Sequence, residues 1–256
     1  MCGIVGFIAH TSSEENSNDL SSMLNQIEHR GPDDFGKWVR DGVYLGHRRL
    51  AIHDLTMSGH QPMVSSNGRY IIVFNGEIYN FKALRSEFHK DKWVGDSDTE
   101  VLLHVIESVG LERALTKLNG MFAFAVYDLS LKVLSLCRDP IGEKPLYYGT
   151  IGDRFYFSSE LSSIESVCAG NLSICREAVY QQSMVSYIPA PGSIYKGIYK
   201  LEPGSYVTYS GGVVASSKRF WTLEETIDIG RKNLINDMNE GVDELERAIE
   251  RSVFQI

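Results

Sequence analysis

Short apolar runs bounded by turn residues are the feature that most limits how this chain folds. Runs rich in β-branched and aromatic residues, each bounded by Gly, Asp or Asn, lie at residues 4–8, 43–53, 70–74, 122–127 and 132–138. Such runs are typical of strands, and the short polar turn between the last two is typical of a hairpin. Residues 146–149 and 154–157 predict another hairpin, which turns at Gly152-Asp153. These signals indicate antiparallel sheets.

Amphipathic helices are predicted between these runs. Apolar residues at helical spacing from Leu20 to Ile27 predict one helix, and Gly31-Pro32 ends it near Arg30. Ser97 and Glu100 have the S-x-x-E spacing of a capping box, so a second helix should begin there and stop at Gly110. Shorter helices are predicted over 81–88 and 111–118. Because the helices and hairpins come in groups, without a βαβ rhythm, we expect an α+β fold with helices packed on antiparallel sheets.

Composition narrows the class of protein and of ligand. A chain of 256 residues with 43% hydrophobic and 23% charged residues has room for one large folded domain with an appendage. Its net charge of -8 argues against nucleic acid and anionic lipid, which favours small molecules. The first apolar run, residues 4–9, is too short to span a membrane and follows no basic segment, so a cytoplasmic protein is expected. The four cysteines form no C-x-x-C pair, which predicts reduced thiols and no metal site.

Two short motifs are chemically suggestive but ambiguous alone. Removal of Met1 would leave a thiol and a free α-amine together on Cys2, and an α-amine that titrates near ~7.7–8.0 is able to accept the thiol proton. A small buried side chain at a strand start and an S-acylation site are the alternative interpretations of Cys2. Asn75-Gly76 is either a tight hairpin turn or a pair of hydrogen-bond donors for an anion.

The start of the chain, Met1-Cys2-Gly3-Ile4-Val5-Gly6, resembles that of the class II glutamine amidotransferases, which carry an N-terminal cysteine nucleophile. The resemblance continues in order through His29-Arg30-Gly31-Pro32-Asp33, Gly46-His47-Arg48-Arg49-Leu50-Ala51-Ile52, Gln61-Pro62-Met63, Asn75-Gly76-Glu77-Ile78-Tyr79-Asn80, Ser97-Asp98-Thr99-Glu100 and Arg138-Asp139. Residues 118–124, 142–148 and 187–191 look, more narrowly, like glutamine-dependent asparagine synthetases. The resemblance covers about residues 2 to 221. It implies a four-layer αββα sandwich of two antiparallel sheets, the N-terminal-nucleophile hydrolase fold.

The resemblance also implies residue roles. Cys2 would attack the side-chain amide of glutamine with its own α-amine as base, and the Asn75 side chain and Gly76 N–H would bind the oxyanion. Arg49 would bind the substrate α-carboxylate, whereas Arg48 should point to the opposite face of its strand. Asp98 and Glu77 would bind the α-ammonium, and Asp98 also stands where a carboxylate stabilises a helix start. The remaining glutamine contacts, mainly through backbone, fall on Leu50, Ala51, Ile52 and His53. The turn at residues 30–33 would shape the pocket wall.

The resemblance further predicts how the chain is divided. Residues 1–221 would form the glutamine amidotransferase domain, and residues 222–256 a linker and the first helix of an ATP-dependent synthetase domain that lies beyond this sequence. No cofactor is expected here, because ATP and Mg²⁺ belong to that domain. Ser210-Gly211-Gly212 resembles the start of its S-G-G-x-D-S phosphate loop, but Val214 replaces the required Asp. A hairpin turn is therefore predicted at this position.

The function implied is hydrolysis of glutamine to glutamate and ammonia, as the glutaminase half of an asparagine synthase that amidates aspartate with ATP. Two alternatives stay open. The ammonia could go to another acceptor, such as a sugar carboxylate in surface-polysaccharide synthesis, or the chain could be a non-catalytic regulatory homologue. The expected partners are glutamine and the synthetase domain or subunit, and a homodimer is compatible with the resemblance.

Overall fold

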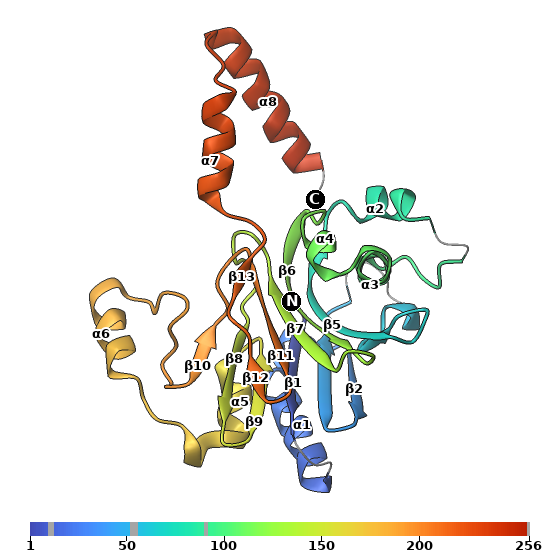
Figure 1. Ribbon diagram of the computed structural model, residues 1–256, viewed down its shortest axis with the longest axis vertical. Helices are drawn as coiled ribbons and strands as arrows, with labels where there is room; N and C mark the ends of the chain where they lie inside the picture. The colour runs from blue at the N-terminus through green and yellow to red at the C-terminus, as the bar shows by residue number, and fades with distance from the viewer. Residues whose placement is uncertain (10–12, 52–55, 90–91, 255–256) are drawn as a thin grey trace.

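The computed structural model describes residues 1–9, 13–51, 56–89 and 92–254. Two antiparallel sheets dominate it, and helices cover them (Figure 1). The first, six-stranded sheet has the order β10-β8-β9-β1-β3-β2. Its strands are β10 (Ile198–Lys200), β8 (Tyr147–Ile151), β9 (Arg154–Ser158), β1 (Gly3–Ile8), β3 (Val43–Arg49) and β2 (Asp34–Arg40).

The second sheet has the order β12-β11-β7-β6-β5-β4, and a further strand, β13, pairs with β11. Its strands are β12 (Val213–Val214), β11 (Ser205–Ser210), β7 (Val133–Arg138), β6 (Gly120–Asp128), β5 (Tyr70–Ile78), β4 (Met63–Val64) and β13 (Lys218–Arg219). The predicted hairpins β6–β7 and β8–β9 are both present. Gly211 and Gly212, both with positive φ, turn the chain between β11 and β12, which confirms the hairpin predicted there.

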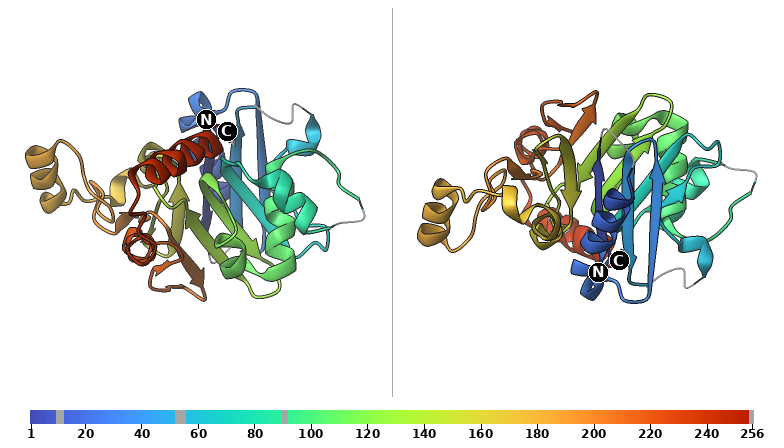
Figure 2. Two further views of the ribbon diagram at one scale, coloured as in Figure 1. Left: turned by 90° about the horizontal axis from the view of Figure 1, so that it is seen from above. Right: turned by 90° about the horizontal axis from the view of Figure 1, so that it is seen from below.

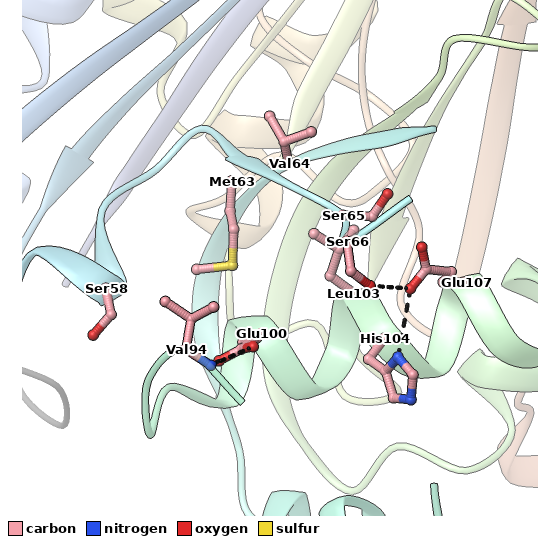
Figure 3. A pocket seen from close by; sticks show the side chains of 10 residues that line it. All are labelled: Ser58, Met63, Val64, Ser65, Ser66, Val94, Glu100, Leu103, His104 and Glu107. Carbon is pink, nitrogen blue, oxygen red and sulfur yellow. Dashed lines mark hydrogen bonds and ion pairs between the residues drawn. The ribbon is translucent and has the colours of Figure 1, made fainter. Parts of the chain in front are cut away.

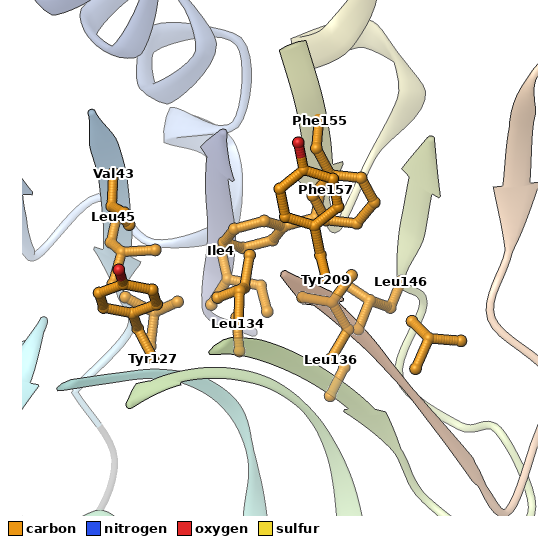
Figure 4. Close-up of a cluster of buried hydrophobic side chains, with 14 of the residues drawn as sticks. Ile4, Val43, Leu45, Tyr127, Leu134, Leu136, Leu146, Phe155, Phe157 and Tyr209 are labelled. Atoms are coloured by element: carbon orange, nitrogen blue, oxygen red, sulfur yellow. The ribbon is translucent and has the colours of Figure 1, made fainter. Parts of the chain in front are cut away.

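Alternation along the strands divides the apolar residues between three cores. Side chains such as Ile4 and Leu45 of the first sheet meet Leu134 and Leu136 of the second in the core between the sheets (Figure 4). The residues that alternate with them point outward and are covered by helices. The predicted four-layer αββα sandwich is therefore confirmed.

The outer helices complete the layers (Figure 2). Helices α1 (Glu14–Gln26) and α5 (Leu161–Cys168) contribute apolar side chains to the core on the outer face of the first sheet. Helices α2 (Phe81–Glu87), α3 (Asp98–Val109) and α4 (Leu111–Leu115) do the same on the second sheet. Short 3₁₀ turns η1 (Glu28–Arg30), η2 (Met57–Gly59) and η3 (Ala169–Asn171) join these elements.

Three helices project from the sandwich (Figure 1). Helix α6 (Arg176–Val185) lies on one side, and α7 (Leu223–Lys232) and α8 (Met238–Phe254) extend from the end of β13. The segment predicted as a linker thus contains a helix, α7, because acidic residues follow the Thr222 cap and basic residues end the helix, a charge order that suits the helix dipole. Neither α7 nor α8 buries a residue, and apolar side chains of α8 such as Leu245 and Val253 stay exposed. Among the described residues, no helix is both long and apolar enough to cross a membrane.

Candidate active site

A pocket opens where the two sheets meet at the start of β1, and most of the predicted site residues line it. It has an empty volume of about 400 Å³, its open mouth included. The lining residues come from the chain start, the end of β3, η2 and the residues after it, the second half of β5 and the start of α3; they are Cys2, Arg49, Leu50, Gly59, Gln61, Phe74, Gly76, Glu77, Ser97, Asp98 and Thr99. A cavity of this size suits a small molecule.

The Cys2 thiol is held by the backbone that follows β3. Its Sγ accepts a hydrogen bond from Leu50 N–H at 3.4 Å and lies 3.6 Å from the Leu50 carbonyl, to which the thiol donates. Burial raises the pKa of Cys2, and the Leu50 hydrogen bond offsets this only in part. The resting group at neutral pH is therefore a thiol, so nucleophilic attack requires a base that removes its proton.

Arg30 fixes the backbone of the same residue. Its Nε donates to the Cys2 carbonyl at 3.0 Å, and one terminal nitrogen forms an ion pair with Glu160 at 2.8 Å. The family resemblance implies that the turn that begins at Arg30 shapes the pocket wall, but it does not imply this contact with Cys2. The link depends on Glu160, which is 130 residues away, so no local pattern could have revealed it.

Asn75 and Gly76 lie within strand β5, so they do not form a hairpin turn. The Asn75 side chain is on the same face as Ile71 and Val73, which points into the space between the sheets. It is 1% exposed, and its Nδ2 has no hydrogen-bond partner among the residues that the structure describes. A buried amide donor without a partner is costly, so its presence at a pocket indicates a ligand that accepts from it.

The hydrogen-bond pattern between β5 and β6 sets the direction of the Gly76 N–H, which points toward the pocket. In an antiparallel pair, alternate residues turn their N–H groups away from the partner strand, and here Phe74, Gly76 and Ile78 turn theirs away from β6. Strand β4 pairs only with Ile71 and Ile72, so it stops short of these residues. Side chains bind the N–H groups of Phe74 and Ile78, and within the described ranges no acceptor is bonded to that of Gly76.

Arg48 and Arg49 point to opposite faces of β3, as predicted. The Arg48 Nε donates to the Leu24 carbonyl of α1 at 3.1 Å, and its guanidinium lies over the Phe35 ring. Arg49, 8% exposed, lines the pocket, where one of its terminal nitrogens donates to the Thr56 carbonyl at 2.9 Å. Arg49 thus supplies a cation to the pocket, while Arg48 secures an outer helix.

Asp98 lies both at the start of a helix and in the lining of the pocket. It is the first residue of α3, after the N-cap Ser97, whose side chain accepts from Glu100 N–H. Its carboxylate also accepts from Ile78 N–H at 2.9 Å and lines the pocket. The capping box itself differs from expectation, because the Glu100 carboxylate accepts from the N–H groups of Val94 and Gly95, further back in the chain.

The structure describes only some of the other residues that are predicted to contact the substrate. Leu50 and Glu77 line the pocket, and the Glu77 charge is one of the influences that raise the pKa of Cys2. Ala51 donates its backbone N–H to Asp33, in the predicted wall segment, at 2.9 Å. Ile52 and His53, which are predicted to contact the substrate, lie outside the described residues. Gln61 and Thr99 line the pocket without having been assigned a role from the sequence, although both lie in the quoted blocks.

A second cavity lies on the other flank of the α3 start, between that helix and the β4 region (Figure 3). Its empty volume of about 540 Å³ exceeds that of the first pocket. Its two carboxylates are already engaged, since Glu100 accepts from Val94 N–H and Glu107 accepts from Ser66 and pairs with His104. The smaller pocket is the better candidate for chemistry, because it holds a thiol and is lined by Phe74 and Gly76, the two neighbours of Asn75, whose buried amide nitrogen has no partner among the described residues.

Next to this pocket, a buried histidine makes stability depend on pH. Burial lowers the pKa of His47 to about 3, so the folded chain keeps the ring neutral where the unfolded chain, with a pKa of about 6.5, is protonated. The unfolded state binds more protons between these values, and stability must fall as the pH drops through this window. Between pH 7 and pH 5, protonation of His47 in the unfolded state should lower the free energy of unfolding by about 2 kcal/mol.

Urea titrations of the wild type and His47→Gln at both pH values test this expectation. The variant should lose about 2 kcal/mol less than the wild type over the same pH interval. Equal losses in the two proteins would show that the folded state does not suppress protonation of this ring.

Comparison with known proteins adds independent findings. Residues 1–221 match the model of the family described as "Glutamine amidotransferase domain". Asparagine synthetase [glutamine-hydrolyzing] 1 of Bacillus subtilis is 41% identical over 216 residues, which cover 81% of this chain and 33% of that protein. Putative asparagine synthetase [glutamine-hydrolyzing] 2 of Methanocaldococcus jannaschii is 38% identical over 79% of this chain and 42% of its own length. The chain thus spans about a third to two fifths of these relatives.

A solved structure supports the fold. Glutamine phosphoribosylpyrophosphate amidotransferase from B. subtilis, in complex with ADP and GMP, superposes with a TM-score of 0.65. The match covers 86% of this chain and 50% of that chain at 21% sequence identity. It therefore concerns the two-sheet architecture alone.

Proposed function

Because this chain belongs to the glutamine amidotransferase domain family, class II, we propose that its pocket hydrolyses glutamine to glutamate and ammonia, with Cys2 as nucleophile after removal of Met1. Met1 itself is 56% exposed, so it lies at the surface of the folded chain. The freed α-amine is then on the same residue as the thiol. It supplies the base that the raised pKa of Cys2 requires.

The reaction has two halves. The α-amine takes the thiol proton as Sγ attacks the side-chain carbonyl carbon of glutamine, and the carbonyl oxygen becomes an oxyanion. The Asn75 Nδ2 and the Gly76 N–H stabilise this charge. The intermediate then collapses: the C–N bond breaks, the protonated amine gives its proton to the leaving nitrogen, and ammonia departs. Water attacks the resulting thioester through the same base, which releases glutamate and restores the thiol.

The charged groups in the pocket match the α-carbon end of glutamine. The Arg49 guanidinium is suited to bind the α-carboxylate with two parallel hydrogen bonds. The carboxylates of Asp98 and Glu77 are suited to bind the α-ammonium. Leu50 and the residues up to His53 would complete the substrate contacts. A ligand that carries a cationic and an anionic group at one end and a neutral amide at the other fits this arrangement of charges.

The observation that carries the proposal concerns the Asn75 Nδ2, which is buried in the strand that lines the thiol pocket. Among the described residues it has no hydrogen-bond partner. A non-catalytic homologue would have no reason to keep an unsatisfied donor there. The direct test is incubation of the Met1-processed chain with glutamine and measurement of glutamate. If neither this chain nor a longer version with a free Cys2 releases glutamate, the proposal is wrong.

Conservative changes at the two adjacent arginines should separate binding from folding. Arg49→Lys removes the planar guanidinium and its two parallel donors. The KM for glutamine should therefore rise about tenfold or more, with a smaller effect on kcat. Arg48→Lys should leave KM unchanged and lower the free energy of unfolding by about 1 kcal/mol, because it weakens the bond to α1. Steady-state kinetics and urea unfolding of both variants provide the measurement. A normal KM for Arg49→Lys would contradict the assignment.

We also propose that the ammonia amidates aspartate in a longer protein, with ATP and Mg²⁺ bound by the segment that follows. The names of the relatives support this acceptor, and the chain covers only a third to two fifths of their length. We propose that this segment contacts the exposed apolar side chains of α8. A full-length protein given glutamine, aspartate and Mg-ATP should form asparagine; glutamate without asparagine would indicate another acceptor.

We place the reaction in the cytoplasm, where thiols stay reduced. Cys2, Cys137, Cys168 and Cys175 are all free cysteines.

A further inference from the structure

Gln61 uses both ends of its side-chain amide to join two parts of the pocket. Its Oε1 accepts from Phe74 N–H of β5 at 2.7 Å, and its Nε2 donates to the Thr99 hydroxyl of α3 at 3.2 Å. The residue is 5% exposed and lines the pocket. Because both bonds are buried and their partners come from different elements, Gln61 fixes the position of β5 relative to the start of α3.

The strand it holds is the one with the proposed oxyanion donors. Among the described residues, β5 has no neighbouring strand on this edge beyond Ile72, since β4 begins at Met63, which pairs with Ile72. In place of a neighbouring strand, the Gln61 side chain accepts the hydrogen bond from Phe74 N–H, and the Asp98 side chain accepts that from Ile78 N–H. The Gly76 N–H lies between these two anchored positions. A shift of the strand at either anchor would move Gly76 and the neighbouring Asn75.

The Phe74 carbonyl is held as well. His47 Nε2 lies 3.1 Å from this oxygen, and since a carbonyl only accepts, the ring nitrogen donates. Both backbone groups of the residue before Asn75 are thus bound by side chains, one from each side of the pocket.

The helix it holds is the one that begins with Asp98. The Thr99 hydroxyl, which accepts from Gln61, donates to the Asp98 Oδ1 at 3.4 Å, and the Asp98 Oδ2 accepts from Ile78 N–H. The bonds therefore form a closed circuit from Phe74 through Gln61, Thr99 and Asp98 back to β5. This circuit includes the proposed ammonium ligand and flanks the proposed oxyanion donor.

We propose that Gln61 is a positioning residue that couples the oxyanion strand to the carboxylate for the substrate ammonium, with Thr99 as the link on the helix side. The inference rests on the proposed glutaminase function. Its consequence is that the two links affect different kinetic parameters. The Thr99 link places Asp98 and so governs substrate binding, whereas the Phe74 link places the oxyanion donors and so governs turnover.

Variants at the two positions test this division in the Met1-processed chain. Thr99→Val keeps the shape of the side chain but removes the hydroxyl, so the KM for glutamine should rise about 2- to 10-fold while kcat stays near the wild-type value. Thr99→Ser keeps the hydroxyl and should restore the wild-type KM. Gln61→Met breaks both links, so its kcat should fall about tenfold or more and its KM should rise with it.

The double variant distinguishes positioning from a general structural role. Because Gln61→Met already breaks the Thr99 link, adding Thr99→Val should not raise KM further, whereas independent structural defects would add. Urea unfolding reports the fold of each variant, and Gln26→Glu on the exposed end of α1 is the matched control. A kcat and KM within twofold of wild type in Gln61→Met, or equal losses of both parameters in Thr99→Val, would overturn the inference. A wild-type chain that releases no glutamate would instead overturn the glutaminase proposal.

Discussion

Replacing Cys2 by alanine is expected to abolish glutamate release from glutamine, with kcat/KM reduced by at least about 10⁴-fold. The thioester forms at the Cys2 Sγ, and alanine has no atom that could replace it. The substitution should leave the fold intact, because the thiol bonds to the backbone of Leu50 and lies at the pocket rather than in a core. Its effect on the free energy of unfolding should stay below about 1.5 kcal/mol.

The control for this experiment is Cys175→Ala. Cys175 is also a partly exposed free thiol, but it bonds to Glu177 near α6, away from the pocket. Its loss should not change the rate. Mass spectrometry of the acid-quenched wild type should find glutamine-derived acyl on the peptide that begins with Cys2, and none in the alanine variant. Undiminished glutamate release by Cys2→Ala would refute the assigned nucleophile.

Asn75→Ala should lower kcat for glutamine hydrolysis by about 10²–10³-fold, with little change in KM. Within the described part of the chain the Nδ2 has no partner, so we expect the donor to be used when the carbonyl oxygen gains charge. The loss therefore falls on the transition state rather than on the bound substrate. Gly76 remains as the second donor, which is why the residual rate should stay well above that of Cys2→Ala.

An exposed asparagine provides the matched control. Asn171→Ala at the end of η3 should keep both kinetic parameters at their wild-type values. Because Asn75 is buried, urea unfolding must accompany the kinetics, so that a loss of folded protein is separated from a loss of turnover. A folded Asn75→Ala with a kcat within threefold of the wild type would show that its amide does not stabilise the oxyanion.

Much of the local structure was predictable. The hairpins β6–β7 and β8–β9 and the N-terminal cap of α3 follow from residue patterns of short range. Strand β5 was predicted only to Phe74, because Asn75-Gly76 interrupts its apolar pattern, whereas pairing with β6 continues it to Ile78. Helices α5 and α6 lie outside the predicted elements, and α7 occupies the predicted linker.

The candidate site was predictable to a different degree. Its main residues followed from a family resemblance, and alternation along β3 correctly placed Arg48 and Arg49 on opposite faces. The contact of Arg30 with the Cys2 carbonyl and the bridge made by Gln61 did not follow from either, since each joins segments that are far apart in the chain.

The sequence by itself determined which side chains share a face of each strand, because the period of two is a property of the extended backbone. It also determined where α3 begins, because Ser97 satisfies a backbone group three residues away. Tertiary packing explains why β4 begins only at Met63 and leaves the edge of β5 beyond Ile72 open beside Cys2. The edge N–H groups of β5 acquire different partners, Gln61 at Phe74 and Asp98 at Ile78, with Gly76 between them. Such partners are set by long-range packing of two sheets and a helix, which no local pattern encodes.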